Sequence, residues 1–99
     1  MEKRKGSVRK YLRGLAHHLK PVVYVGQKGL TENFFGAANQ ALDEHELIKI
    51  KFTRFKHEKK ELAKEIEQQT RSEMVGLIGN IAIFYRQHHD EEKRSIQLP

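Results

Sequence analysis

The strongest constraint on the fold is the segment from Pro21 to Gly29, which combines a proline, an apolar run and a glycine-bounded loop. Pro21 cannot continue a helix, so a preceding helix must end by residue 20. Val22 to Val25 is short and rich in β-branched residues, and such an unbroken apolar run predicts a central strand buried on both faces. Gly26-Gln27-Lys28-Gly29 ends the strand, and Thr31 is placed to cap a helix that follows at once.

The segments on either side of this unit also carry periodic patterns. Residues 8–20 predict a first helix with Ser7 as its N-cap. The predicted core-facing stripe of this helix is Val8, Leu12, Leu15, Ala16 and Leu19. The helix after Thr31 has a similar stripe, made of Phe34, Phe35, Ala38, Ala41 and Leu42.

The second half of the chain predicts one more helix and three strands. Residues 46–52 alternate, which predicts a half-exposed strand with Lys49 and Lys51 on its open face. Residues 57–70 predict a third helix, and two apolar runs, 74–78 and 81–85, flank a Gly-Asn pair typical of a tight hairpin. The residues from 87 onward are charged, and we expect them to be loosely held.

These elements predict an α/β fold in the order α-β-α-β-α-β-β, with a mixed four-stranded sheet. A chain of 99 residues has material for one modest core, so we expect a single domain over 1–99. Its core is expected at about 7–87, with a charged tail at 88–99.

Charge is distributed unevenly along the chain. Residues 1–30 carry eight basic side chains and one acidic, and residues 49–64 carry seven and two, whereas residues 31–48 carry four acidic and no basic ones. With a net charge of +6, this pattern favours a polyanion partner contacted by two basic segments on one face. A well-mixed, solvated surface is the alternative. The candidate contacts are Arg9, Lys10, Arg13, His17, Lys20, Lys28, Lys49, Lys51 and Arg86, with Arg54 and Lys56 resting on charge alone.

The loop Gly26-Gln27-Lys28-Gly29 could hold a phosphate, because glycines allow close backbone approach and a helix N-terminus attracts anions. An ordinary strand-to-helix turn explains the same four residues equally well. The loop matches neither a Walker A sequence nor the dinucleotide fingerprint. A KH domain uses a similar loop, but between two helices. Tyr85 or Phe55 could stack on an unpaired base, although partly buried structure is the simpler explanation for each.

Other functions find little support in the residues. The chain has no cysteine, which excludes disulfides, thiolate metal sites and cysteine nucleophiles. No serine or carboxylate pair has the setting of a catalytic group, and the adjacent pairs His17-His18 and His88-His89 are poor metal sites. No stretch reaches the roughly 20 apolar residues of a membrane helix. We therefore expect no metal, no cofactor, no membrane contact and a cytoplasmic location.

Four blocks of the sequence together resemble the CRM domain (chloroplast RNA splicing and ribosome maturation) in its bacterial stand-alone form, the YhbY family. The blocks are Leu12–His17, Leu19–Thr31, His45–Lys51 and Ile78–Arg86, and the resemblance covers residues 7–99. It implies a fold similar to the C-terminal domain of a bacterial translation initiation factor. It also implies RNA binding through a basic surface that includes Gly26, Gln27, Lys28 and Gly29, association with precursors of the large ribosomal subunit, and no enzymatic activity.

The leading hypothesis is therefore a non-catalytic protein that binds ribosomal RNA during large-subunit assembly, with a monomer favoured. The alternative is an adaptor that docks on ribosomal proteins or assembly factors through its basic face. A third hypothesis, an enzyme that holds a phosphorylated substrate in the glycine loop, has only the loop in its favour.

Overall fold

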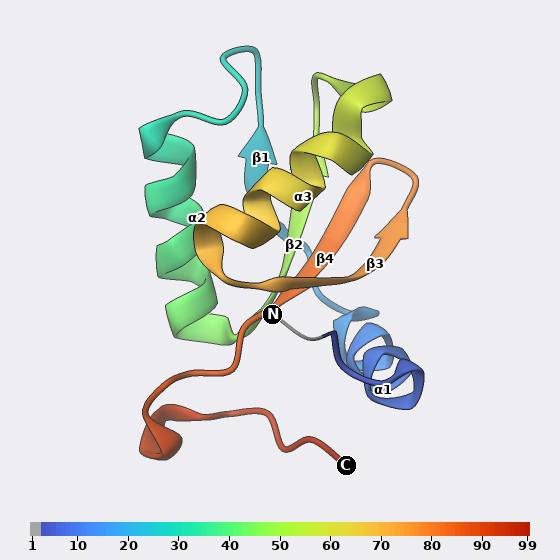
Figure 1. Ribbon diagram of the computed structural model, residues 1–99, viewed down its shortest axis with the longest axis vertical. Coiled ribbons are helices and arrows are strands. Elements are labelled where there is room, and N and C mark those ends of the chain that lie inside the picture. Colours follow the sequence, from blue (N-terminus) through green and yellow to red (C-terminus); the bar gives the residue numbers. More distant parts are fainter. Residues whose placement is uncertain (1–2) are drawn as a thin grey trace.

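Residues 3–99, the part of the chain that the computed structural model describes, fold into one sheet with helices on both faces (Figure 1). The elements are α1 (Gly6–Ala16), β1 (Pro21–Val25), α2 (Glu32–His45), β2 (Leu47–Phe52), α3 (Lys59–Thr70), β3 (Glu73–Ile78) and β4 (Ile81–Tyr85), with short 3-10 turns η1 (Lys56–Glu58) and η2 (Glu91–Lys93). This order confirms the predicted α/β fold with its mixed four-stranded sheet.

The strand order is β1-β2-β4-β3, with β1 parallel to β2 and the other neighbours antiparallel. The predicted hairpin is confirmed, since Ile78 pairs with Ile81 across a two-residue turn whose Gly79 has a φ of 58°. The prediction that β1 is a central strand was wrong. It lies at the sheet edge, where Val22 and Tyr24 are 50% and 55% exposed. An apolar run does not reveal how many neighbours a strand has.

The larger core lies between the sheet and the two helices α2 and α3 on one face. Val23 and Val25 of β1 point into it, and so do Ile48, Ile50 and Phe52 of β2, whose alternation was predicted. Thr31 caps α2 as predicted, because its hydroxyl oxygen accepts a hydrogen bond from the Phe34 amide at 3.0 Å. The core members are Val23, Val25, Phe34, Ala38, Ala41, Leu42, Ile48, Ile50, Phe52, Ala63, Ile66, Ala82 and Phe84.

A smaller core forms where α1 covers part of the opposite face. Leu12 and Ala16 pack there against Leu47, Val75, Ile83 and Tyr85. The prediction of Ser7 as the N-cap was wrong, because α1 begins at Gly6 with Lys5 as its N-cap and no side-chain cap. The helix also ends four residues before the expected limit. The predicted core-facing stripe was wrong for Leu15 and Leu19, which are about 40% exposed, and Leu19 lies beyond the end of the helix.

The segment after β4 is not loosely held, contrary to our expectation. The Glu46 carboxylate, 1% exposed, accepts hydrogen bonds from the backbone amides of His88, Ser95 and Ile96 at 2.7, 2.8 and 3.0 Å. Ile96 and Leu98 pack against the smaller core. A buried carboxylate that accepts several amide hydrogens fixes a segment whose composition alone suggests mobility.

Candidate nucleic-acid interface

The loop from Gly26 to Leu30 joins the carboxyl end of β1 to α2. The Gly29 amide donates to the Gly26 carbonyl oxygen at 3.0 Å, which closes a tight turn with Gln27 and Lys28 exposed at its tip. The strand runs directly into the loop and a helix follows, so the strand-to-helix setting that separates this loop from a KH loop is confirmed. The loop therefore presents one mobile cation and one amide side chain to solvent.

The N-terminus of α2 contributes less to anion binding than its position suggests. The Thr31 hydroxyl oxygen already satisfies the Phe34 amide, and Glu32 places a carboxylate in the first turn. A negative side chain there offsets the positive end of the helix dipole. The attraction of this loop for phosphate therefore rests on Lys28 and the loop backbone.

The two glycines of the loop have different roles. Gly29 has a φ of +71°, whereas Gly26 does not have a positive φ and an added Cβ there would meet nothing within 4 Å. We expect Gly29→Ala to lower the free energy of unfolding by about 1 kcal/mol, because the left-handed conformation penalises a Cβ. Gly26→Ala, the matched control, should change it by less than about 0.5 kcal/mol or increase it slightly. Urea unfolding of both variants checks this, and equal losses would contradict it.

A second loop, residues 53–58, is held beside the first. The Val25 carbonyl oxygen accepts hydrogen bonds from the Thr53 hydroxyl at 2.8 Å and from the amides of Thr53 and Arg54 at 3.1 and 3.3 Å. Since β1 and β2 are parallel, their carboxyl ends meet at the same edge of the sheet. Figure 1 shows both loops at one end of the molecule. Lys28 of the basic segment 1–30 thus lies at the same end of the molecule as Arg54 and Lys56 of segment 49–64.

We call this region the loop-end surface. Its members are Gln27, Lys28, Lys51, Arg54, Phe55 and Lys56, all exposed. Lys51 joins it because it pairs with Tyr24 near the end of β2. Glu32 and Glu58 lie at its margins. In the sequence Arg54 and Lys56 have no role beyond charge, and only the parallel pairing brings their loop to the same end of the sheet as the loop that carries Lys28.

The basic residues of α1 lie elsewhere, because α1 precedes β1 and the glycine loop follows it (Figure 1). Two of them make contacts with other residues of the fold. The Arg13 guanidinium donates to the Val75 carbonyl oxygen at 2.8 Å, and Arg9 Nε lies 3.9 Å from a carboxylate oxygen of buried Glu73. Lys10, His17 and Lys20 are exposed. The expected single basic face is therefore divided between two ends of the molecule.

Lys49 and Arg86 are also engaged within the fold. The Lys49 ammonium donates to the Leu19 carbonyl oxygen at 2.9 Å. The Arg86 guanidinium donates to Asn39, the Thr70 carbonyl oxygen and Asp43, which lie on the α2 and α3 side of the sheet. Neither residue belongs to the loop-end surface. As an RNA contact each stays a prediction, and their contacts indicate a structural role.

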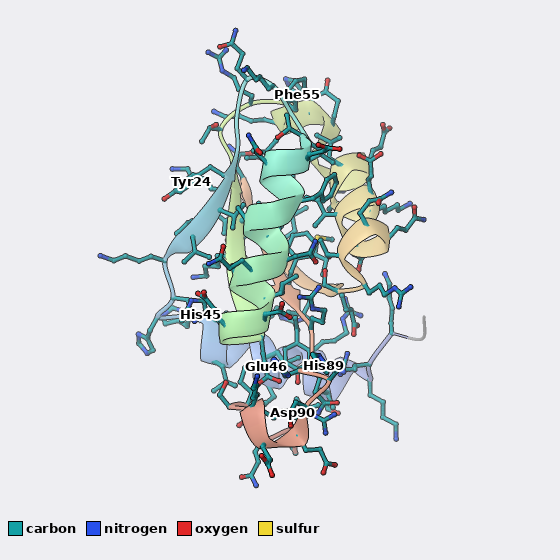
Figure 2. The ribbon with its side chains drawn as sticks, turned by 90° about the vertical axis from the view of Figure 1, so that its left-hand side faces the viewer. Tyr24, His45, Glu46, Phe55, His89 and Asp90 are labelled. Atoms are coloured by element: carbon teal, nitrogen blue, oxygen red, sulfur yellow. The ribbon has the colours of Figure 1, made fainter. Side chains whose placement is uncertain are left out.

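The two aromatic candidates, Tyr85 and Phe55, differ in their exposure to solvent. Tyr85 is 0% exposed, so it cannot offer a stacking face. Burial and the nearby Glu46 carboxylate raise the pKa of its hydroxyl, while Arg4 and Arg94 oppose that shift. Phe55 is 42% exposed and lies at the end of the molecule opposite Glu46 (Figure 2).

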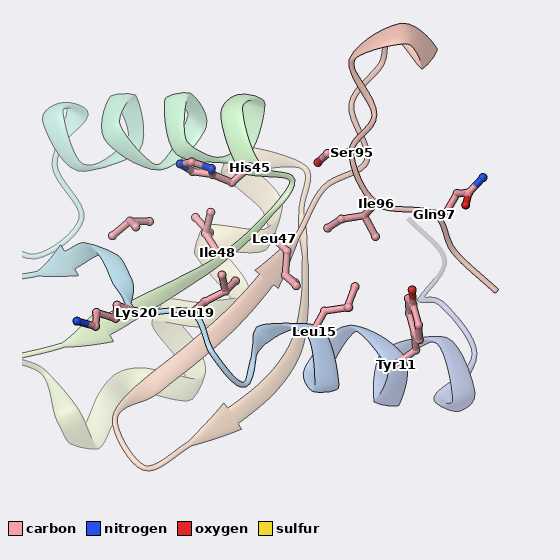
Figure 3. Close-up of a pocket in the computed structure, with 11 residues that line it drawn as sticks. Tyr11, Leu15, Leu19, Lys20, His45, Leu47, Ile48, Ser95, Ile96 and Gln97 are labelled. Carbon is pink, nitrogen blue, oxygen red and sulfur yellow. The ribbon is translucent and has the colours of Figure 1, made fainter.

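An apolar groove of about 510 Å³ lies at the α1 end of the molecule (Figure 3). Tyr11 and Leu15 of α1, Leu19, Val22 and Ile96 line it. It is larger than the two hollows at the loop-end surface, of about 390 and 380 Å³. Lys20, His45, Ser95 and Gln97 are its polar lining residues, and none of its lining residues belongs to the loop-end surface.

Within residues 3–99, no cluster of three or more His, Asp or Glu side chains is placed to hold a metal ion. In the same part of the chain, no helix has the length and apolar character needed to cross a membrane.

The comparisons with known proteins decide the family. The model of the CRS1/YhbY (CRM) domain matches residues 5–86, most of the chain. The chain belongs to the CRM-domain family. An RNA-binding protein of Haemophilus influenzae is 42% identical over 92 residues, covering 92% of this chain and 90% of the relative. A probable RNA-binding protein of Bacillus subtilis is 33% identical over 95 residues, covering 95% and 97%.

A solved structure supports the same assignment for the fold. The solution structure of a hypothetical Staphylococcus aureus protein, described as a candidate RNA-binding protein, superposes with a TM-score of 0.80 at 35% identity. It covers 98% of this chain, and this chain covers all of it. The part matched by the CRM model includes both loops of the loop-end surface and stops before the C-terminal segment held by Glu46. The names of these relatives describe RNA-binding proteins and not enzymes.

Proposed function

We propose that this CRM-domain protein binds RNA through its loop-end surface, without catalysis, and that its target is ribosomal RNA of large-subunit precursors. The observation that carries the proposal is the meeting of two basic loops at the carboxyl ends of β1 and β2, fixed by hydrogen bonds to the Val25 carbonyl oxygen. The RNA-binding relatives support the chemical class of the ligand. The resemblance to the YhbY family is the support for the ribosomal target.

The charges favour a backbone contact. Lys28, Arg54 and Lys56 are exposed and come from two different loops, so they can reach phosphates on successive nucleotides. Each phosphate that a cation neutralises releases condensed counterions, which makes the affinity depend on salt. Lys59, the first residue of α3, donates hydrogen bonds from its ammonium to the Gly79 carbonyl oxygen at 2.7 Å and to Asn80 Oδ1 at 3.2 Å, which fixes the start of α3 and so holds the second loop in place.

The double variant Lys28→Ala, Lys56→Ala tests the surface. We expect the plot of log affinity against log salt, measured with a large-subunit ribosomal RNA fragment, to flatten by about two units, one for each lost phosphate contact. The control is Lys64→Ala, Lys93→Ala, which removes the same charge from exposed positions on α3 and η2. An equal change of slope in both variants would mean that only the net charge matters.

Duplex DNA of matched length separates RNA recognition from a general basic surface. We expect RNA to bind more tightly, and we expect the protein to sediment with large-subunit precursors in a gradient of cell lysate. Equal and weak binding to both polymers would favour the adaptor hypothesis, in which the basic face contacts an acidic protein partner. Sedimentation only at the top of the gradient would contradict the ribosomal target.

A further inference from the structure

Phe55 has a backbone conformation that its local structure does not explain. Three residues other than glycine have a positive φ within residues 3–99: Glu46, Phe55 and Arg71. Arg71 ends α3 in the left-handed conformation that is common at a helix terminus. Glu46 follows α2 with φ 63° and ψ −41°, and its buried carboxylate is held by the C-terminal segment. Phe55 ends no helix, yet it has φ 57° and ψ 38°. A bulky residue in this conformation is an outlier that costs energy and is often found at a functional position.

Burial does not explain the position of the Phe55 ring either. The preceding aromatic, Phe52, is 0% exposed in the main core, whereas Phe55 is 42% exposed. One edge of its ring rests on Gly29, where an added Cβ would lie 3.5 Å from Cε2 and 3.8 Å from Cζ. The glycine loop therefore supports the ring from one side, while a large part of the ring remains open to solvent. An exposed aromatic fixed in this way is a surface on which another flat group can stack.

The Phe55 ring lines a hollow together with basic side chains, one amide and one carboxylate. A hollow of about 380 Å³ is lined by Gln27 of the first loop and by Arg54, Phe55, Lys56, His57 and Glu58 of the second. Gln27 also lines the neighbouring hollow over the glycine loop. Proteins that bind single-stranded nucleic acid combine these parts: a basic track for the phosphates and an aromatic face for a base.

We propose that Phe55 stacks on an unpaired base, so that the loop-end surface selects single-stranded RNA over duplex RNA. This inference rests on the proposed function, because Lys28, Arg54 and Lys56 hold the phosphates on either side of that base. In a duplex the bases stack on each other and offer no free face to the ring. Gln27 lies where its amide can meet the edge of the stacked base.

Phe55→Leu is the decisive variant. Leucine retains an apolar contact with Gly29 and the same backbone penalty, but it has no aromatic face. We expect Phe55→Leu to weaken binding to an unstructured 12-nucleotide RNA by about ten-fold, because the stacking of one base on the aromatic ring is lost. The salt slope should not change, and Phe55→Trp should restore the affinity. Quenching of 2-aminopurine in the RNA should disappear with leucine and return with tryptophan.

Two further RNAs separate the possible failures. On an oligonucleotide of the same length without bases, the parent protein and Phe55→Leu should bind equally. On a blunt-ended RNA duplex, which has no unpaired bases, both should bind equally and more weakly than the parent binds the single strand. The stacking proposal would be wrong, while RNA binding stands, if Phe55→Leu bound the single strand with the affinity of the parent. The same holds if the substitution weakened binding to the abasic strand as much as binding to the strand with bases. If the parent binds none of these RNAs, the proposed function itself fails.

Discussion

Glu46→Ala is expected to release the C-terminal segment and to lower the free energy of unfolding by about 3 kcal/mol at neutral pH. The lost interactions are four hydrogen bonds to a buried carboxylate, from the amides of His88, Ser95 and Ile96 and from the Ser95 hydroxyl. Hydrogen bonds to a charged group contribute about 1.5–3 kcal/mol each. The loss is smaller than their sum, because the released amides regain water.

Urea unfolding and amide hydrogen exchange measure this effect. Exchange should become fast in residues 88–98 and stay slow in β2 and β4. Glu44→Ala is the control, since Glu44 is exposed and its interactions are with nearby Gln40 and His45, and it should change stability by less than about 0.5 kcal/mol. Slow exchange in residues 88–98 of Glu46→Ala would show that Glu46 does not hold the segment.

The same carboxylate predicts a response to acid. Burial alone would raise the pKa of Glu46, but the backbone hydrogen bonds from His88, Ser95 and Ile96 together outweigh it, so the pKa lies below its ordinary value of 4.5. A lowered pKa means that the stabilisation is complete well above pH 4.5 and is lost as the pH falls below it. The stability difference between the parent and Glu46→Gln should therefore shrink on acidification. A difference independent of pH would contradict this pKa.

Arg86→Ala is expected to lower the free energy of unfolding by about 3 kcal/mol. One nitrogen of the guanidinium donates to Asn39 Oδ1 and the Thr70 carbonyl oxygen, both at 2.7 Å. The other donates to the Asn39 carbonyl oxygen at 3.0 Å and to Asp43 at 2.9 Å. These bonds join the end of β4 to both α2 and α3. The ion pair with the exposed Asp43 adds little, because solvent screens it.

Measuring both stability and RNA affinity distinguishes a structural role of Arg86 from a role as an RNA contact. Arg86→Lys should recover only part of the stability, since one ammonium cannot reach this set of acceptors. RNA affinity and its salt slope, measured at a temperature where each variant is folded, should match those of the parent. Unchanged stability with a flatter salt slope would instead make Arg86 an RNA contact.

The elements of the fold were predictable because their signals are local. The Ile48, Ile50, Phe52 alternation fixes which face of β2 is buried, and Thr31 caps α2 through an amide three residues away. The Gly-Asn turn likewise specifies the last hairpin. Each of these signals acts within a few residues, so the sequence shows it directly. The edge position of β1 has no such signal, since it depends on which strands pair.

For the candidate site, the sequence by itself determined the glycine loop, the helix after it and the two basic segments. Only the tertiary structure decided which cations share a surface, because the parallel pairing of β1 with β2 brings the loop that carries Lys28 to the same end of the sheet as Arg54, Phe55 and Lys56. It also engaged Arg13 and Arg86 within the fold and fixed the C-terminal segment on Glu46. A charge in a sequence shows that a side chain can attract an anion. Which group the side chain contacts depends on residues far apart in the chain, and only the folded structure specifies those contacts.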